Sequence, residues 1–256
     1  MSTRKRAVPA EAEPSPVRLS EEAAAPLLKS GEIVGGRRIA WGSNYTFLVH
    51  IAAGPGEYLR AVYKPRDGEQ PLHDFPGGTL YKREYATFLV SRALGWPRIP
   101  VTVIRDGHYG DGSIQLFIES EPDVTYFNLA GERNEELYQM AVFDLLVNNA
   151  DRKAGHCLLD SEGLLWSIDH GLTFHPDFKV RTVMVDLWGR PFPTSLLPDL
   201  EALVPKLEGK AELAESLSTA LSGEEITTLR RRLDAMLADP VLPRLDRRRN
   251  VPWPLV

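Results

Sequence analysis

The residues that stand out first are charged side chains placed at the ends of apolar segments, where they could act on a phosphorylated ligand. Lys64 follows the apolar run Ala61–Tyr63, and Pro65 after it restricts Lys64 to an extended backbone. Because an unpaired lysine is costly to bury, two interpretations stand. Lys64 either grips the phosphates of a nucleotide or protects the edge of a sheet against aggregation.

A polar loop, Asn148–His156, follows the apolar end of a predicted helix. Asp151, Lys153 and His156 stand at positions 0, +2 and +5 within it. A kinase catalytic loop has a base aspartate, a cation and a metal-binding asparagine at these spacings. The spacing therefore favours phosphoryl transfer, and the alternative is a solvated loop whose Asn and Asp residues make turns.

A second aspartate, Asp169, ends the run Trp166–Ile168 and begins an Asp-x-Gly motif, 18 residues after Asp151. A hairpin between them would bring the two carboxylates together. Paired carboxylates at a cleft suit a divalent cation and phosphate oxygens. Asp-x-Gly alone is a weak motif, but Lys64, Asp151 and Asp169 in this order are a stronger indication of nucleotide chemistry.

A small-residue turn, Gly42-Ser43-Asn44, lies between two predicted strands. Small residues let backbone N–H groups approach an anion closely, as a phosphate-covering loop requires. A plain hairpin turn has the same composition, so the turn taken alone favours the hairpin.

The elements that must position these residues fall into two groups. Short strands separated by Gly-rich turns dominate the first half and are typical of an antiparallel meander, at 33–41, 44–52, 58–64, 101–105 and 114–119. One helix interrupts them; Thr79 can cap it and Gly95 can end it. The second half has helical periodicity at 134–147, 196–207, 211–221 and 224–237, with a hairpin turn at 160–163.

We therefore predict an α+β fold of two lobes with a ligand cleft between them. The expected divisions are a disordered tail at 1–18, a strand-rich lobe at 19–119, a helical lobe carrying the catalytic hairpin at 120–238, and an extended tail at 239–256.

Composition excludes several classes of protein. The formal net charge of −5 argues against a nucleic-acid partner held by bulk charge. A single cysteine, Cys157, excludes an intramolecular disulfide and favours a reducing cytoplasm. The longest apolar run, at 47–53 if His50 is counted within it, is far shorter than the roughly 20 residues of a membrane-spanning helix. We expect a cytoplasmic protein without a transmembrane segment or secretory signal.

These segments resemble the phosphatidylinositol 3-/4-kinase superfamily. The matching residues are Val62–Pro65, the Asp151-Arg152 loop, Ile168–Phe174 and Gly42–Phe47, within about residues 33–175. The resemblance is closest to type II phosphatidylinositol 4-kinases and an uncharacterised actinobacterial lipid-kinase-like family, with HipA-type kinases more distant. It implies a two-lobed atypical kinase fold that binds ATP with Mg²⁺ or Mn²⁺.

On the nucleotide side, the resemblance implies that Lys64 holds the α- and β-phosphates and that Glu84 orients it. The other interpretation of Glu84 is a surface carboxylate beside Lys82 or Arg83. The turn Gly42-Ser43-Asn44 would cover the phosphates. An inter-lobe strand would read adenine through its backbone, namely Gln115, Phe117, Ile118 and Glu119 with Leu116 between them.

On the chemical side, the resemblance implies that Asp151 accepts the proton of the acceptor hydroxyl. Lys153 would neutralise charge on the γ-phosphoryl, and Asp169 would bind the metal. His156 departs from the family, which has Asn at this position. An imidazole suits transition metals better than Mg²⁺. The presence of His156 therefore predicts a preference for Mn²⁺, binding of a single metal ion, or weak catalysis. The alternative is a structural role, in which His156 packs against Trp166.

The predicted function is an ATP-dependent phosphotransferase acting on a hydroxyl of a protein, an inositol lipid or a small metabolite. The acidic net charge and the absence of the cysteine-rich membrane tether of type II kinases weigh against a lipid. The alternatives are a nucleotide-binding pseudokinase and a kinase-fold AMP transferase.

Overall fold

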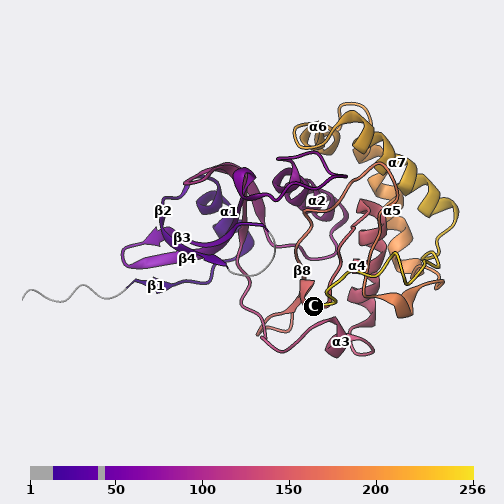
Figure 1. Ribbon diagram of the computed structural model, residues 1–256, viewed down its shortest axis with the longest axis horizontal. Helices are drawn as coiled ribbons and strands as arrows, with labels where there is room; N and C mark the ends of the chain where they lie inside the picture. Colours follow the sequence, from indigo (N-terminus) through magenta and orange to yellow (C-terminus); the bar gives the residue numbers. More distant parts are fainter. Residues whose placement is uncertain (1–13, 40–43) are drawn as a thin grey trace, which may run out of the picture.

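The computed structural model describes residues 14–39 and 44–256, and these residues form a sheet-based lobe and a helical lobe (Figure 1). The sheet has the order β2-β3-β4-β6-β5 with antiparallel neighbours. Its strands are β2 (Ile33–Ile39), β3 (Thr46–Gly54), β4 (Glu57–Pro65), β6 (Gly110–Leu116) and β5 (Thr102–Gly107). The predicted α+β fold of two lobes is therefore confirmed.

The register of the sheet decides which face carries Lys64. Lys64 pairs with Ser113, and Val62 pairs with Gln115. Directly opposite residues of an antiparallel pair share a face, and successive residues alternate. The intervening Tyr63 therefore lies on the other face, which packs against helix α1 (Glu21–Ser30). Lys64 is left on the face that looks towards the helical lobe.

The helical lobe is built around helix α4 (Asn134–Val147), which coincides with the predicted helix. Met140, Phe143 and Leu146 are at most 1% exposed, as expected for a helix that is apolar on most sides. Asn148 ends the helix with a left-handed backbone at φ 56°. The remaining helices and strands of this lobe are α3 (Tyr126–Leu129), β7 (Cys157–Leu159), β8 (Leu165–Ser167), α5 (Leu197–Leu203), α6 (Glu212–Ser218) and α7 (Gly223–Ala238).

Helix α2 (Leu80–Leu94) lies between the sheet and the helical lobe (Figure 1). Gly95 ends it with a left-handed backbone, as predicted. Thr79 stands at the N-cap position, as predicted, but its side chain does not cap the helix, because its hydroxyl donates to the carbonyl of Pro76 at 2.7 Å. The carboxylate of Glu69 instead accepts the N–H of Tyr81 at 2.9 Å and supplies the negative charge that a helix N-terminus favours.

The prediction of disorder through residue 18 is also wrong for its last residues. Ser15–Pro16 form strand β1, which pairs in parallel with Glu57 and Tyr58 of β4. Strand β6 pairs with β4 only from Ala61 to Pro65, so the start of β4 offers a free edge. That edge supplies the backbone partners of β1. Residues 1–13 lie outside the described residues.

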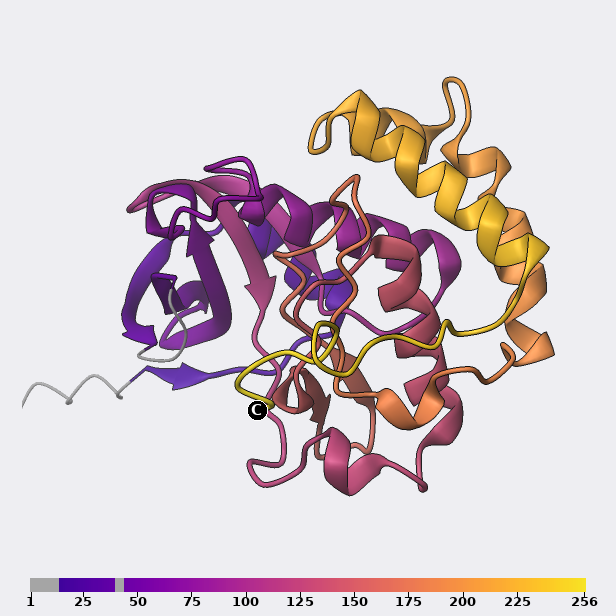
Figure 2. The ribbon, with the colours of Figure 1, turned by 45° about the vertical axis from the view of Figure 1, so that its right-hand side comes forward.

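The last 18 residues contain no helix and return across the helical lobe (Figure 2). The N–H of Thr182 donates to Asn250 at 2.9 Å, and the N–H of Ala154 donates to the carbonyl of Leu255 at 2.8 Å. This tail therefore lies directly against the loop that follows α4.

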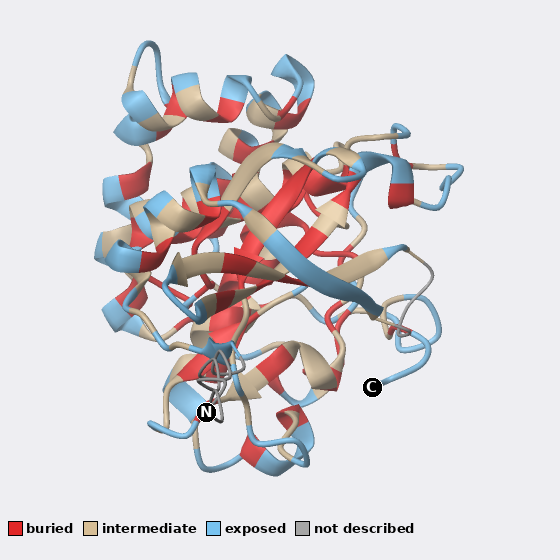
Figure 3. Cartoon of the chain, turned by 90° about the vertical axis from the view of Figure 1, so that its left-hand side faces the viewer, coloured by how far each residue is buried: buried red, intermediate tan, exposed pale blue. Residues whose placement is uncertain are grey.

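Burial follows this architecture (Figure 3). The central strands and the inner faces of the helices are buried, whereas the middle of β2 at the sheet edge is exposed. Within residues 14–39 and 44–256, none of the helices has the length and apolar composition needed to span a bilayer.

Candidate active site

Three charged side chains from different elements meet where the lobes face each other. Lys64 at the end of β4 donates from Nζ to the carboxylate of Glu84 on α2 and, at 2.9 Å, to Oδ1 of Asp169 after β8. Glu84 is only 2% exposed, so it is an internal partner of Lys64. Burial alone would lower the pKa of Lys64, but Asp169 and Glu84 outweigh burial and raise it. Lys64 is therefore a charged ammonium held between two carboxylates.

The loop after α4 presents Asp151 and Lys153 to the same region. Nζ of Lys153 lies 3.5 Å from Oδ2 of Asp151, and the N–H of Asp151 donates to Oδ1 of Asn149 at 3.0 Å. Burial raises the pKa of Asp151 to about 6, against the opposing charge of Lys153. A carboxylate with this pKa is largely ionised at neutral pH and is more basic than an exposed aspartate, which suits a general base.

The β7–β8 hairpin brings His156 to Asp169. The N–H of Ile168 donates to the carbonyl of His156 at 3.1 Å, and Nε2 of His156 lies 3.3 Å from Oδ2 of Asp169. Burial lowers the pKa of His156 to about 4, so the ring is neutral at pH 7. Its Nδ1 accepts the N–H of Lys153 at 3.3 Å, which places the ring proton on Nε2, facing Asp169.

The donor set of His156 and Asp169 fits a cation that arrives with phosphate. In the part of the chain that the structure describes, no group of three or more His, Cys, Asp or Glu side chains could hold a metal ion. Mg²⁺ at nucleotide sites usually takes one or two protein ligands, and phosphate oxygens and water complete its shell. Two converging protein donors match that arrangement and do not match a cage built by the protein alone.

The predicted phosphate-covering turn is described only at Asn44, because Gly42 and Ser43 lie outside the described residues. The side-chain oxygen of Asn44 accepts the N–H of Gln70 at 2.7 Å. This bond links the turn to the segment that leads from β4 to α2.

The inter-lobe segment differs from the prediction. Strand β6 ends at Leu116, opposite Ala61, so the predicted strand does not extend to Glu119. The N–H of Phe117 donates to the carbonyl of Arg60 at 3.1 Å, and the carboxylate of Glu119 binds the guanidinium of Arg60. The Gln115 side chain is buried, and its Nε2 donates to Oγ1 of Thr102 at 2.8 Å.

Three buried polar residues behind the loop that follows α4 received no role from the sequence. Asp144, Arg152 and His170 are each at most 1% exposed. Nε of Arg152 donates to Oδ2 of Asp144 at 2.7 Å. A signal was present, because Asp144 stands in the otherwise apolar segment 142–147, and a buried charge needs a partner.

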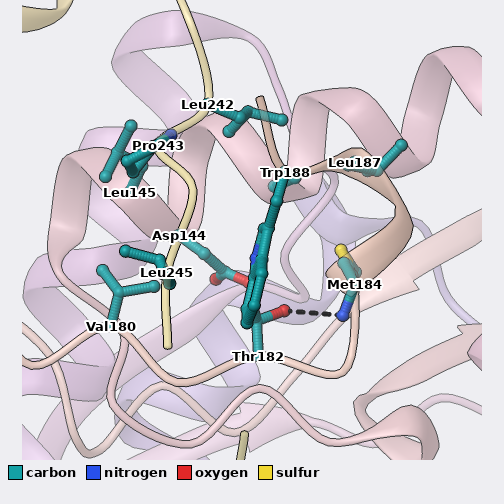
Figure 4. A pocket seen from close by; sticks show the side chains of 11 residues that line it. Asp144, Leu145, Val180, Thr182, Met184, Leu187, Trp188, Leu242, Pro243 and Leu245 are labelled. Carbon is teal, nitrogen blue, oxygen red and sulfur yellow. Dashed lines mark hydrogen bonds between the residues drawn. The ribbon is translucent and has the colours of Figure 1, made fainter. Parts of the chain in front are cut away.

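A small cavity lies on the far side of Asp144, between α4, the segment around Trp188 and the returning tail (Figure 4). Its volume of about 20 Å³ is enough for a single water. Nε1 of Trp188 is buried there without a partner among the described residues. The cavity is too small for a nucleotide, and neither Lys64 nor Asp169 lines it.

Solved structures of kinase-like proteins have the same fold. The hydra Fam20 structure with sugar matches with a TM-score of 0.59 over 84% of this chain and 86% of that chain, at 17% identity. The Golgi casein kinase with Mn/ADP bound matches with a TM-score of 0.57 over 85% and 74%, also at 17% identity. The Helicobacter pylori proinflammatory kinase CtkA gives a TM-score of 0.52 over 83% and 94%, at 12% identity.

Sequence comparison identifies the family. Protein Rv2133c of Mycobacterium tuberculosis is 37% identical over 263 residues, which cover 89% of this chain and 94% of that protein. Residues 105–242 match the family described as phosphatidylinositol 3- and 4-kinase. The resemblance found in the Lys64, Asp151 and Asp169 segments is thereby confirmed at the level of the superfamily. The chain belongs to the phosphatidylinositol 3- and 4-kinase family.

Proposed function

We propose that the protein is an ATP-dependent phosphotransferase that moves the γ-phosphoryl group to a hydroxyl of an acceptor. The observation that carries this proposal is the ion-pair network of Lys64, Glu84 and Asp169, placed beside the loop that presents Asp151. A lysine held between two carboxylates from different elements has its place and its charge fixed before a ligand arrives. Such fixed charges are what phosphoryl transfer requires, because catalysis rests on positioning and electrostatic stabilisation.

Lys64 would hold the α- and β-phosphates, with Glu84 keeping its ammonium in place. Asp169 and His156 would hold Mg²⁺ or Mn²⁺, which would supply positive charge to stabilise the oxygens of the phosphoryl group during transfer. For Nε2 of His156 to bind a cation, its proton must move to Nδ1, and the contact with the Lys153 N–H would then be lost. Because the N–H of Phe117 already donates to the carbonyl of Arg60, the backbone of Ile118 and Glu119 would recognise adenine.

Asp151 would take the proton of the acceptor hydroxyl at its carboxylate. Lys153, beside Asp151, would neutralise charge on the transferring group. The 3.5 Å contact between the two side chains would keep both groups close to the acceptor hydroxyl and the transferring phosphoryl group.

Incubation with γ-labelled and α-labelled ATP tests the proposal directly. Transfer of the γ label to an acceptor or to water, abolished in Asp151→Asn, supports a phosphotransferase. Transfer of the α label would mean AMP transfer. Binding of ATP without transfer of either label would select the pseudokinase, which is favoured by one observation, the imidazole of His156 at the position of the metal-binding asparagine. Acceptor class is read from the labelled product, with protein, inositol lipid and small hydroxyl metabolites supplied separately.

A further inference from the structure

Asp169 has a backbone conformation that its neighbours must enforce. Its φ of 60° lies in the left-handed region, which is uncommon for a residue other than glycine. Such a conformation raises the energy of the folded chain and persists only where the surrounding structure fixes it. The residues that fix it therefore control where the Asp169 carboxylate points.

Arg152 binds on both sides of Asp169. Its guanidinium is fully buried, and a guanidinium has five N–H donors. Nη1 donates to the carbonyl of Ile168 at 3.0 Å, immediately before Asp169, and to the carbonyl of His156 at 3.3 Å. Nη2 donates to Nε2 of His170 at 2.8 Å, immediately after Asp169. The other two donors go to the Asp144 carboxylate of α4, at 2.7 and 2.8 Å.

His170 completes the arrangement. Since arginine can only donate, Nε2 of His170 is an acceptor and the ring proton is on Nδ1. The Ser167 hydroxyl contacts the same nitrogen at 3.0 Å. The backbone N–H of His170 donates to Oε2 of Glu84 at 3.1 Å, and the carbonyl accepts from Thr173 at 2.8 Å. The residue after Asp169 is thus held through both its backbone and its ring.

We propose that Arg152 and His170 are positioning residues that hold Asp169 in its left-handed conformation and aim its carboxylate at Lys64 and at the cation. The part of this proposal that concerns the cation rests on the function proposed above. Anchoring on Asp144 makes α4 the fixed reference for Asp169. The same guanidinium holds the His156 carbonyl, so both expected metal ligands are placed by one side chain.

Stability alone does not explain this cluster. A buried ion pair such as Arg152–Asp144 is often no more stabilising than well-packed apolar residues of similar volume. Instead, the five N–H donors of the Arg152 guanidinium bind acceptors in four places: the loop after α4, the residue after β8, the ring of His170 and the Asp144 carboxylate on α4. That distribution fixes relative positions, which packing of apolar side chains would define less sharply.

The test compares His170→Leu with His170→Gln. Leucine removes the acceptor and leaves an Arg152 donor unsatisfied, whereas the amide oxygen of glutamine can accept in place of Nε2. Cys157→Ala is the matched control, because Cys157 is also fully buried in the same hairpin, and among the described residues its thiol has no hydrogen-bond partner other than the sulfur of Met140.

Amide hydrogen exchange of residues 167–171 in the ligand-free protein is the first measurement. We expect exchange to accelerate at least about tenfold in His170→Leu and to stay within about threefold of wild type in His170→Gln. Cys157→Ala should leave these amides unchanged even where its melting temperature falls. Unchanged exchange in His170→Leu, or equal acceleration in Cys157→Ala, overturns the proposal.

The second measurement is the affinity for Mn²⁺ with a non-hydrolysable ATP analogue. We expect a loss of about tenfold or more in His170→Leu and recovery in His170→Gln. Equal affinity in wild type and His170→Leu would contradict the positioning role. If wild type binds no Mn²⁺–nucleotide, the proposed function fails, and hydrogen exchange still decides whether Arg152 and His170 hold Asp169.

Discussion

At the scale of single residues, Lys64 forms ion pairs with two carboxylates that differ in solvent exposure. The Glu84 side chain is 2% exposed and that of Asp169 is 50% exposed. Removing the ammonium therefore leaves Glu84 as the buried, uncompensated charge. Loss of Lys64 is expected to weaken nucleotide binding. The contact with Glu84 adds an effect on folding.

We predict that Lys64→Met lowers ATP affinity at least about tenfold and the free energy of unfolding by about 3 kcal/mol. The control is the Lys64→Met/Glu84→Gln double variant, which removes both charges and should regain most of the stability without regaining ATP affinity. Urea denaturation and calorimetric titration measure the two quantities. Wild-type ATP affinity in Lys64→Met would place Lys64 outside the nucleotide site.

The pKa of Asp151 determines where activity is expected to fall at acid pH. Burial raises its pKa to about 6, and a general base must be ionised. Turnover should therefore be complete above this pKa and fall about tenfold for each pH unit below it. Measurement of kcat/KM between pH 4.5 and pH 8 checks the midpoint. A flat profile across pH 6 would exclude Asp151 as the base.

His156 should not contribute to that midpoint. Burial lowers its pKa to about 4, whereas an exposed histidine would titrate near 6.5. The ring stays neutral, and able to bind a cation, as pH falls through 6. We predict that His156→Asn shifts the cation preference from Mn²⁺ towards Mg²⁺ and leaves the midpoint near pH 6 unchanged. The measurement is nucleotide-dependent affinity for both ions at several pH values; an unchanged preference would remove His156 from the metal site.

At the scale of elements, α2 is fixed from the side opposite the sheet by α7. The buried guanidinium of Arg83 donates to the carboxylate of Glu225 and to the carbonyl of Thr173. Glu225 also forms a capping box with Ser222, accepting its N–H at 2.8 Å. One carboxylate thus begins α7 and anchors the helix that carries Glu84.

We predict that Glu225→Ala lowers the free energy of unfolding by about 3 kcal/mol or more, because Arg83 is left as a buried unpaired charge. Glu224→Ala is the control, since Glu224 is exposed in the same helical turn and should change stability by no more than about 0.5 kcal/mol. Chemical denaturation compares the two. A similar, small effect of both substitutions would mean that the ion pair does not fix α2.

The sequence correctly predicts the helices and strands whose first and last residues are determined by the local sequence. Helix 134–147 has a strong apolar content and Asn148 at its end, and its bounds are correct. The strand expected to reach Glu119 stops at Leu116, opposite Ala61, and the start of β4 pairs with β1 instead. Strand β1 was missed for a related reason. A two-residue strand exists only because β4 has a free edge, which no local pattern of Ser15–Pro16 records.

The site residues also divide into those that the sequence predicts and those that it does not. Lys64, Asp151 and Asp169 could be found because each stands at the end of an apolar segment at a characteristic spacing. The joint role of Arg152 and His170 could not, because it depends on which acceptors surround a buried guanidinium after folding. Asp144 left the one usable signal, a charge within an apolar helix.

At the scale of the whole molecule, function depends on pairs that are distant in sequence. The Lys64–Asp169 contact joins residues 105 positions apart and links the two lobes. The tail returns to the same region, where Leu255 accepts the N–H of Ala154 beside the catalytic loop. Contacts between segments far apart in the sequence thus join the sheet to the residue after β8, and the end of the described chain to the loop after α4.

The central claim is that Asp151 acts in transfer and Lys64 in nucleotide binding. The most direct test measures ATP affinity and single-turnover transfer of the γ-phosphoryl group on the same samples of wild type and Asp151→Asn. In Asp151→Asn we expect an ATP affinity within about threefold of wild type and a transfer rate lower by about 100-fold or more, since only the base is lost. A variant that loses affinity and transfer in equal measure, or keeps the wild-type transfer rate, would contradict it.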